Sequence, residues 1–180
     1  MTEPVPALSH LDQAIAGTWR LDPARSEVEF HARSFYGLVT VHGQFESYDG
    51  TIDLGREPAV QLTIDAASLT TINARRDTHL RSLDFFDVEH HHYVRFLSTS
   101  AMLQGEMLKL HGHLHAAGKQ VSIDLEATLH PVDDEFEIDT TVQVDQRELG
   151  MTWSPLGMLR HPTTLTVHGR LIREPSPTPS

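Results

Sequence analysis

The chain has 180 residues, no cysteine and a formal net charge of −11 with histidine neutral. This length suits one domain with a sizeable core, and the absence of cysteine excludes disulfides, thiolate nucleophiles and cysteine metal sites. The acidic balance argues against nucleic acid and against electrostatic docking on anionic membranes. Residues 1–17 lack the basic and apolar regions of a secretory signal, and no apolar run is long enough to span a membrane. We therefore expect a cytoplasmic protein with no nucleic-acid partner and no stable membrane insertion.

Most of the chain alternates between apolar and polar residues, which is the pattern of a β-strand with one buried face. The alternation follows a poorly patterned arm at residues 1–16. An Asp49-Gly50 pair carries a turn signal, so we expect a return strand over Thr51 to Leu54. The inward residues of the other early runs are Val28, Phe30 and Ala32; Val39, Val41, Gly43 and Phe45; Val60, Leu62 and Ile64; and Val94, Phe96 and Ser98.

The long break in this pattern, residues 73–88, starts like a helix. Asn73 is the expected N-cap, and Asp77 lies early in the helix, where negative charge suits the dipole. Leu80 and Leu83 are three residues apart, so we expect them to share one face. Two adjacent phenylalanines follow. A short helix with paired phenylalanines between strands indicates either a plug over a β structure or, more simply, a crossover helix that completes the core.

The best-specified strands surround Ala117-Gly118, which we interpret as a two-residue hairpin turn. Counting from this turn pairs Leu114 with Val121, Leu110 with Leu125, His111 with Asp124, and Lys109 with Glu126. Apolar residues then meet apolar ones and opposite charges meet, whereas a slip of one residue would ruin both faces. Strands over residues 136–145 and 165–171 follow, and we expect the Pro/Ser-rich tail at 174–180 to be disordered.

The result is about eight long antiparallel strands, which can close into a barrel that holds one small ligand or can fold as a sandwich. Small residues at inward positions favour a cavity over a filled core, although they also relieve tight curvature. These small inward residues are Ala32, Gly43, Ser98, Gly112, Ala127, Thr140 and Gly169.

Several motifs along residues 17–173 identify a known family. They are Trp19-Arg20-Leu21-Asp22-Pro23, Gly43-Gln44-Phe45, Ser68-Leu69-Thr70-Thr71, Gly112-His113-Leu114, Lys119-Gln120-Val121, Arg147 to Met151 and, most specifically, RDTHLRSLDFFDV at 76–88. The chain resembles the YceI-like, polyisoprenoid-binding proteins. It departs from their pattern at His90-His91-His92, at Leu149 and at residues 155–162, and it lacks the signal peptide that many relatives carry. The resemblance implies an all-β fold, a single extended antiparallel eight-stranded lipocalin-like barrel with a short helical insert.

The resemblance also implies binding without catalysis. Family members hold a long isoprenoid chain, such as a polyprenyl quinone or polyprenyl phosphate, in an apolar tunnel, and burial of such a chain is worth ~25 cal/mol per Å². We therefore expect an isoprenoid lipid or quinone as ligand and no other cofactor. The sequence leaves both a monomer and a homodimer as alternatives. The expected wall is Phe30, Phe45, Leu62, Ile64, Phe96, Ile123, Leu125, Ile138 and Val142, with Leu80, Phe85, Phe86 and Trp153 at one end. Each of these residues could equally be plain core.

Arg76, Asp77 and His79 are expected to be structural, through an ion pair and helix positioning, rather than contacts to a head group. If the protein is instead a lipocalin-like enzyme acting on a small apolar substrate, it needs an inward-facing histidine or carboxylate. Glu148, at a strand end, is the nearest candidate for that group. The sequence contains neither a nucleophile elbow nor a phosphate loop, so the enzyme interpretation is the weaker one.

Thirteen histidines leave a metal- or haem-binding barrel as a further alternative. His111, His113 and His115 alternate on the outer face of one strand, ~6.6–6.8 Å apart, so two of them could share a metal with Asp124 as a third ligand. A solvated strand face explains them more simply. The run at residues 90–92 has the same weakness, because adjacent side chains of an extended chain point to opposite faces.

Overall fold

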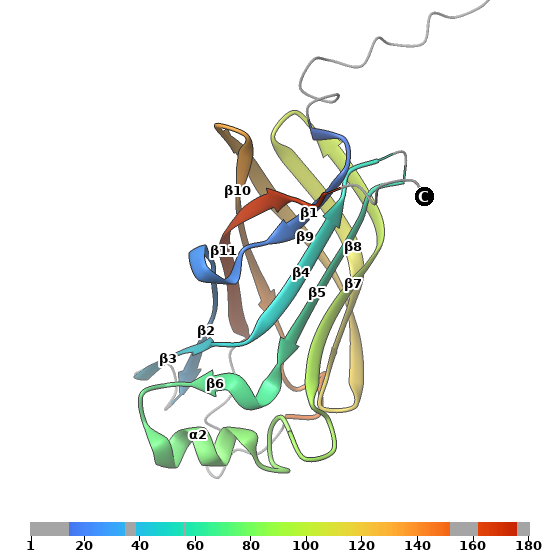
Figure 1. Ribbon diagram of the computed structural model, residues 1–180. Coiled ribbons are helices and arrows are strands. Elements are labelled where there is room, and N and C mark those ends of the chain that lie inside the picture. The colour runs from blue at the N-terminus through green and yellow to red at the C-terminus, as the bar shows by residue number, and fades with distance from the viewer. Residues whose placement is uncertain (1–14, 35–38, 56, 152–161, 176–180) are drawn as a thin grey trace, which may run out of the picture.

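The computed structural model describes residues 15–34, 39–55, 57–151 and 162–175, and Figure 1 shows a curled sheet with one helix lying across its end. The helix is α2 (Ala74–Arg81), and two short 3-10 helices are η1 (Pro23–Arg25) and η3 (Ala66–Ser68). The strands are β1 (Thr18–Leu21), β2 (Glu27–Ser34), β3 (Val39–Phe45), β4 (Tyr48–Asp53), β5 (Ala59–Asp65), β6 (Leu69–Thr70), β7 (Tyr93–Gln104), β8 (Met107–Ala116), β9 (Lys119–Val132), β10 (Glu135–Val144) and β11 (Thr163–Arg173).

The sheet closes into an eight-stranded antiparallel barrel in the order β1-β4-β5-β7-β8-β9-β10-β11, because β1 also pairs with β11. The other three strands continue barrel strands that are broken in two. β1 and β2 lie end to end along β11, and β3 and β6 extend β4 and β5 in the same way. The break between β1 and β2 falls at Pro23, which has no N–H to donate to a ladder. The predicted fold is therefore confirmed.

The predicted register between β8 and β9 is also confirmed. Leu114 pairs with Val121 and His111 with Asp124, as counted from the turn. Ala117 and Gly118 have φ angles of 48° and 73°, which is the left-handed pair that a type I′ hairpin turn requires. Turn geometry and the alternating faces thus specify one register, since each rules out the neighbouring one.

The predicted turn at Asp49-Gly50 is wrong. Both residues lie inside β4, where Gly50 pairs with Leu62, and the bend falls earlier, where Ser47 N donates to Ser68 Oγ at 3.0 Å. A Cβ on Gly50 would lie 3.3 Å from the side chains of Leu21 and Leu62. The glycine is therefore used for close packing in the barrel wall rather than for a turn.

The helix begins as predicted, with Asn73 accepting a hydrogen bond from Arg76 N at 3.0 Å, but Leu83 does not share its buried face. The helix ends at Arg81, and Ser82 N bonds back to His79 O at 3.1 Å, so the chain has turned away before Leu83. Leu80 packs against the core, whereas Leu83 is 76% exposed.

Side chains fill the barrel end that lies opposite α2 in Figure 1. Trp19 and Phe136 meet edge to face with ring centroids 4.7 Å apart, and Leu108 and Leu129 are fully buried beside this end. Ile15, which belongs to the expected N-terminal arm, is also buried, and its carbonyl accepts a hydrogen bond from Trp19 Nε1 at 2.7 Å. In the described part of the chain, no helix has the length and apolarity needed to cross a membrane.

Candidate ligand cavity

Between the filled end and α2 the barrel encloses a cavity of about 440 Å³, within the range of small-molecule sites. Every barrel strand contributes inward side chains to its wall, and almost all of them are apolar. The filled-end residues Trp19, Leu108, Leu129 and Phe136 do not line the cavity. The lumen is therefore blind at that end.

All the predicted wall and end residues that the structure describes do line this cavity. They are Phe30, Phe45, Leu62, Ile64, Leu80, Phe85, Phe86, Phe96, Ile123, Leu125, Ile138 and Val142. Trp153 lies outside the described residues. The alternation of inward and outward residues predicts these positions. A closed barrel has a single interior, so every inward residue below the filled end faces the same lumen.

The sequence suggested that small inward residues leave room in the lumen. Two of them, Gly43 and Gly112, are instead covered by aromatic rings. A Cβ on Gly43 would lie 2.2 Å from the ring of Phe30, its partner across β2 and β3. A Cβ on Gly112 would lie 2.8 Å from the ring of Phe96. Each glycine lets a phenylalanine lie against the wall, and the ring therefore takes up less of the lumen.

The insert closes the α2 end through a series of aromatic contacts. Phe86 meets Phe45 edge to face with ring centroids 6.0 Å apart, and Phe45 lies 5.4 Å from Phe30 on the wall. Phe85 is 5.2 Å from the ring of His79 on the helix. The paired phenylalanines and Leu80 are partly buried against the core, which supports the interpretation of this insert as a plug.

A polar clamp fixes the start of the insert. The buried Asp77 carboxylate accepts hydrogen bonds from Thr71 N at 2.8 Å, Thr71 Oγ1 at 2.5 Å and Thr70 Oγ1 at 3.3 Å. Burial raises the pKa of Asp77, but these hydrogen bonds outweigh burial and hold the pKa below its usual value. Arg76 Nε donates to Thr71 Oγ1 at 2.7 Å and Arg76 Nη2 to Thr71 O at 3.0 Å. Instead of forming the expected ion pair, Arg76 and Asp77 both bind Thr71.

Polar side chains missed by the sequence reasoning give the cavity a polar end. Gln146 and Thr163 line the lumen where β10 ends and β11 begins, at the same end as α2 (Figure 1), and Thr163 Oγ1 donates to Gln146 Oε1 at 3.2 Å. Arg76 and His79 line it from the helix. Gln146 follows the last inward position of β10 by two residues, so continuing the alternation past Val144 would have found it.

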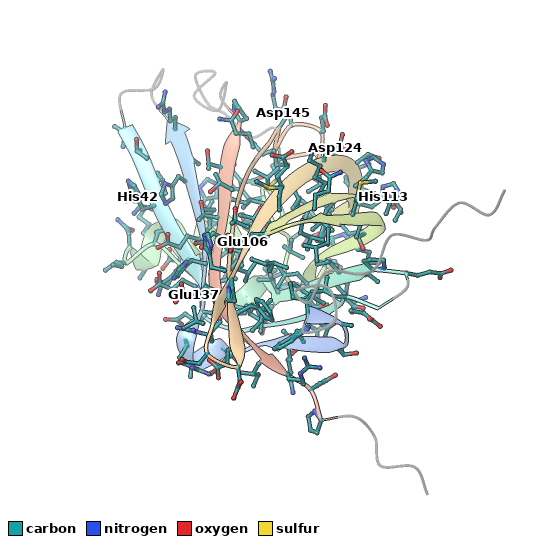
Figure 2. The ribbon with its side chains drawn as sticks, turned by 90° about the horizontal axis from the view of Figure 1, so that it is seen from above. His42, Glu106, His113, Asp124, Glu137 and Asp145 are labelled. Carbon is teal, nitrogen blue, oxygen red and sulfur yellow. The ribbon has the colours of Figure 1, made fainter. Side chains whose placement is uncertain are left out.

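The outer histidines do not assemble into a metal site. His111 Nδ1 lies 2.7 Å from Asp124 Oδ1, but the rings of His111 and His113 are 6.3 Å apart, and those of His113 and His115 are 6.5 Å apart. Figure 2 shows His113 and Asp124 on the outside of the barrel, far from His42. Within residues 15–34, 39–55, 57–151 and 162–175, no three His, Cys, Asp or Glu side chains are placed to hold a metal ion.

Two further polar candidates also lie away from the lumen. His90 Nδ1 is 2.8 Å from Asp87 Oδ1, and the hydrogen bond with Asp87 raises the pKa of His90. Glu148 is exposed in the turn after β10 and does not line the cavity. Neither residue therefore faces a substrate that the lumen could hold.

Comparison with known proteins agrees with this architecture. Residues 19–171 match the family model of the YceI-like domain. Protein YceI of Escherichia coli O157:H7 is 32% identical over 121 residues, which are 64% of this chain and 63% of that protein. The chain thus spans somewhat less than two thirds of the length of this curated relative.

Solved structures of low sequence identity share the barrel. BcnA of Burkholderia cenocepacia aligns with a TM-score of 0.75 at 17% identity, over 84% of this chain and 99% of BcnA. A polyisoprenoid binding domain from Saccharophagus degradans, implicated in plant cell wall breakdown, aligns with a TM-score of 0.70 at 12% identity, over 88% of this chain and 99% of that domain. At such identities the likeness shows the fold alone.

Proposed function

Because the chain belongs to the YceI-like family, we propose that it binds a long-chain isoprenoid lipid in its barrel, as a carrier or sequestering protein without catalysis. The observation that carries the proposal is the blind, almost wholly apolar cavity below the Trp19–Phe136 contact. The name of the Saccharophagus degradans domain, a relative in fold, supports the same ligand class.

An apolar lumen favours a hydrocarbon ligand for a simple reason. Each 100 Å² of hydrocarbon removed from water contributes about 2.5 kcal/mol, and the lumen offers an isoprenoid no unpaired polar group that would offset this gain. In the described residues, every buried side-chain nitrogen and oxygen has a hydrogen-bond partner within the protein. The chain of the lipid would therefore lie among the Phe, Leu, Ile and Val side chains of the wall.

The polar end of the cavity suits the head of such a lipid. His79 and Gln146 are polar side chains that line the lumen at the α2 end, so the head of the lipid would lie beside them. Because the opposite end is filled, the hydrocarbon tail would point toward Trp19. We infer a polyprenyl quinone or a polyprenyl phosphate as the ligand.

The test is mass spectrometry of a solvent extract of the protein purified without detergent, together with uptake of a polyprenyl quinone offered in ethanol. We expect a stoichiometric isoprenoid species or saturable uptake. A Leu110→Trp variant, whose indole would project into the lumen, serves as the blocked control. An empty extract with no uptake by the wild type would refute the proposal.

A further inference from the structure

The barrel wall between β9 and β10 is hydrogen-bonded along only part of its length. The ladder runs from the turn at residues 132–135 to the pair Thr140–Ala127 and ends there. Both strands continue beyond this pair, β9 bonded to β8 and β10 bonded to β11. Within the described residues, no pair joins residues 119–126 of β9 to residues 141–144 of β10. The gap between these two segments is a lateral slit in the wall.

The slit opens onto the cavity, away from the filled end. The bonded half of the ladder carries Leu129 and Phe136, which belong to the filled end. The inward residues of the two segments that flank the slit include Leu125 on β9 and Val142 on β10, and both line the cavity. They are only partly buried, whereas Leu129, Phe136 and Ile138 of the bonded half are buried. Exposed inward apolar residues are expected where the wall is incomplete.

A side chain fixes the point at which the two strands part. Thr140 Oγ1 donates to Glu126 O at 2.8 Å, and Glu126 is the first residue of β9 beyond the last bonded pair. The hydroxyl therefore ties the strands together at the closed end of the slit. Beyond this point the two strands can move apart without breaking a ladder hydrogen bond, because none joins them there.

An open groove of about 1020 Å³ lies against the slit on the outside of the barrel. Leu110, Leu125, Thr140 and Val142 line both this groove and the cavity. The two hollows therefore meet at the slit, and three apolar side chains and one threonine lead from the surface to the lumen. The rest of the groove is largely polar, so it is a wet entrance rather than a resting place for hydrocarbon.

The two ends of the barrel are less suited to the passage of a ligand. Trp19 and Phe136 fill one end. The insert closes the other, where Phe86 packs on Phe45 and the buried Asp77 carboxylate holds the start of the insert. Opening either end would separate packed rings or break buried hydrogen bonds, whereas widening the slit costs apolar contacts alone.

We propose that the slit between β9 and β10 is the route by which an apolar ligand, here the isoprenoid, enters and leaves the cavity. The inference rests on the proposed function and adds the path to it. The hydrocarbon passes between Leu125 and Val142, which are apolar on both sides of the gap. Gln146 follows the end of β10 that borders the slit. A lipid that enters tail first can therefore extend toward Trp19 and leave its head beside Gln146.

The experiment closes the slit with a covalent bridge. Because the chain contains no cysteine, the double substitution Asp124→Cys and Gln143→Cys supplies the two thiols, which a bis-maleimide with a reducible linker joins. Both positions line the groove, and continuing the register of the ladder sets them opposite each other across the slit. We expect the bridge to slow uptake of a polyprenyl quinone from ethanol about tenfold, because the strands can no longer separate, and reduction of the linker to restore the rate.

The matched control places the same bridge on the same two strands where they are already bonded. His130 and Glu137 are paired in the ladder, so His130→Cys with Glu137→Cys, once bridged, leaves the slit open. This protein should take up quinone at its unbridged rate. Mass spectrometry of the intact chains verifies one linker in each.

The outcomes separate the route from the ligand. Slow uptake by the bridged Asp124/Gln143 variant alone supports the slit as the route, and uptake at the unbridged rate, or equal slowing in the control, overturns it. If the wild type takes up no quinone, the proposed function fails, and entry of the small apolar dye N-phenyl-1-naphthylamine, followed by its fluorescence, decides the route by itself. Slower entry of the dye into the bridged Asp124/Gln143 variant alone supports the slit. Entry at the unbridged rate, equal slowing in the control, or no entry into the wild type overturns it.

Discussion

Replacing Ile72 by asparagine should stabilise the protein, although it removes a large apolar side chain. Ile72 has a φ of 59°. This left-handed conformation costs a β-branched residue about 1–2 kcal/mol, and asparagine adopts it with much less strain. Because Ile72 is 98% exposed, its removal forfeits almost no burial. The bond from its N–H to Thr70 Oγ1 is a backbone contact and survives the change. We therefore expect a gain of about 1 kcal/mol, or roughly 2–4 °C in Tm for a chain of this size.

Urea denaturation followed by circular dichroism measures this gain as a shift of the midpoint with an unchanged slope. Leu83→Asn is the matched control, since Leu83 is also exposed but does not have a positive φ, and its effect should stay within about 0.5 kcal/mol. Should Ile72→Asn leave stability unchanged or lower it, the turn is not strained as described.

Three further predictions concern the lumen and the clamp. Leu110→Trp should abolish quinone uptake while costing about 1–3 kcal/mol by overpacking; retained uptake would place the ligand outside the lumen. Gly43→Ala should destabilise by about 1–3 kcal/mol in urea, because its Cβ would meet the Phe30 ring at 2.2 Å, and a Phe30→Leu background should reduce that cost. The Asp77 pKa is lowered in the folded state, so its contribution to stability is present above the unfolded value of about 3.9 and is lost as the pH falls below it. The stability of Asp77→Asn, measured in urea, should therefore fall less between pH 5 and pH 3 than that of the wild type, and parallel curves would contradict this role.

Residue alternation was enough to predict which side chains face the lumen. Phe30, Ile64 and Ile138 line the cavity because successive strand residues point to opposite faces and a closed sheet has only one inside. The register of β8 and β9 could be counted from Ala117-Gly118, since a tight turn leaves no freedom in the pairing. The N-cap at Asn73 is equally local, because it depends on residues within one helical turn.

Other features depend on neighbours that are distant in the chain. Asp49-Gly50 has the sequence of a turn, yet Leu21 and Leu62 pack against Gly50 within a strand. Leu83 has the spacing of a buried helix residue, yet the chain bends away after Arg81.

What the sequence by itself determined is the alternation, and with it long antiparallel strands that each have one apolar face, whereas the choice of a barrel over a sandwich came from the family motifs. Only the tertiary structure decided that Trp19 and Phe136 fill one end, that phenylalanine rings cover the wall glycines, and that the outer histidines stay apart. The physical reason is that alternation is a property of each strand, whereas a filled end, a covered glycine or a metal site exists only where separate strands meet.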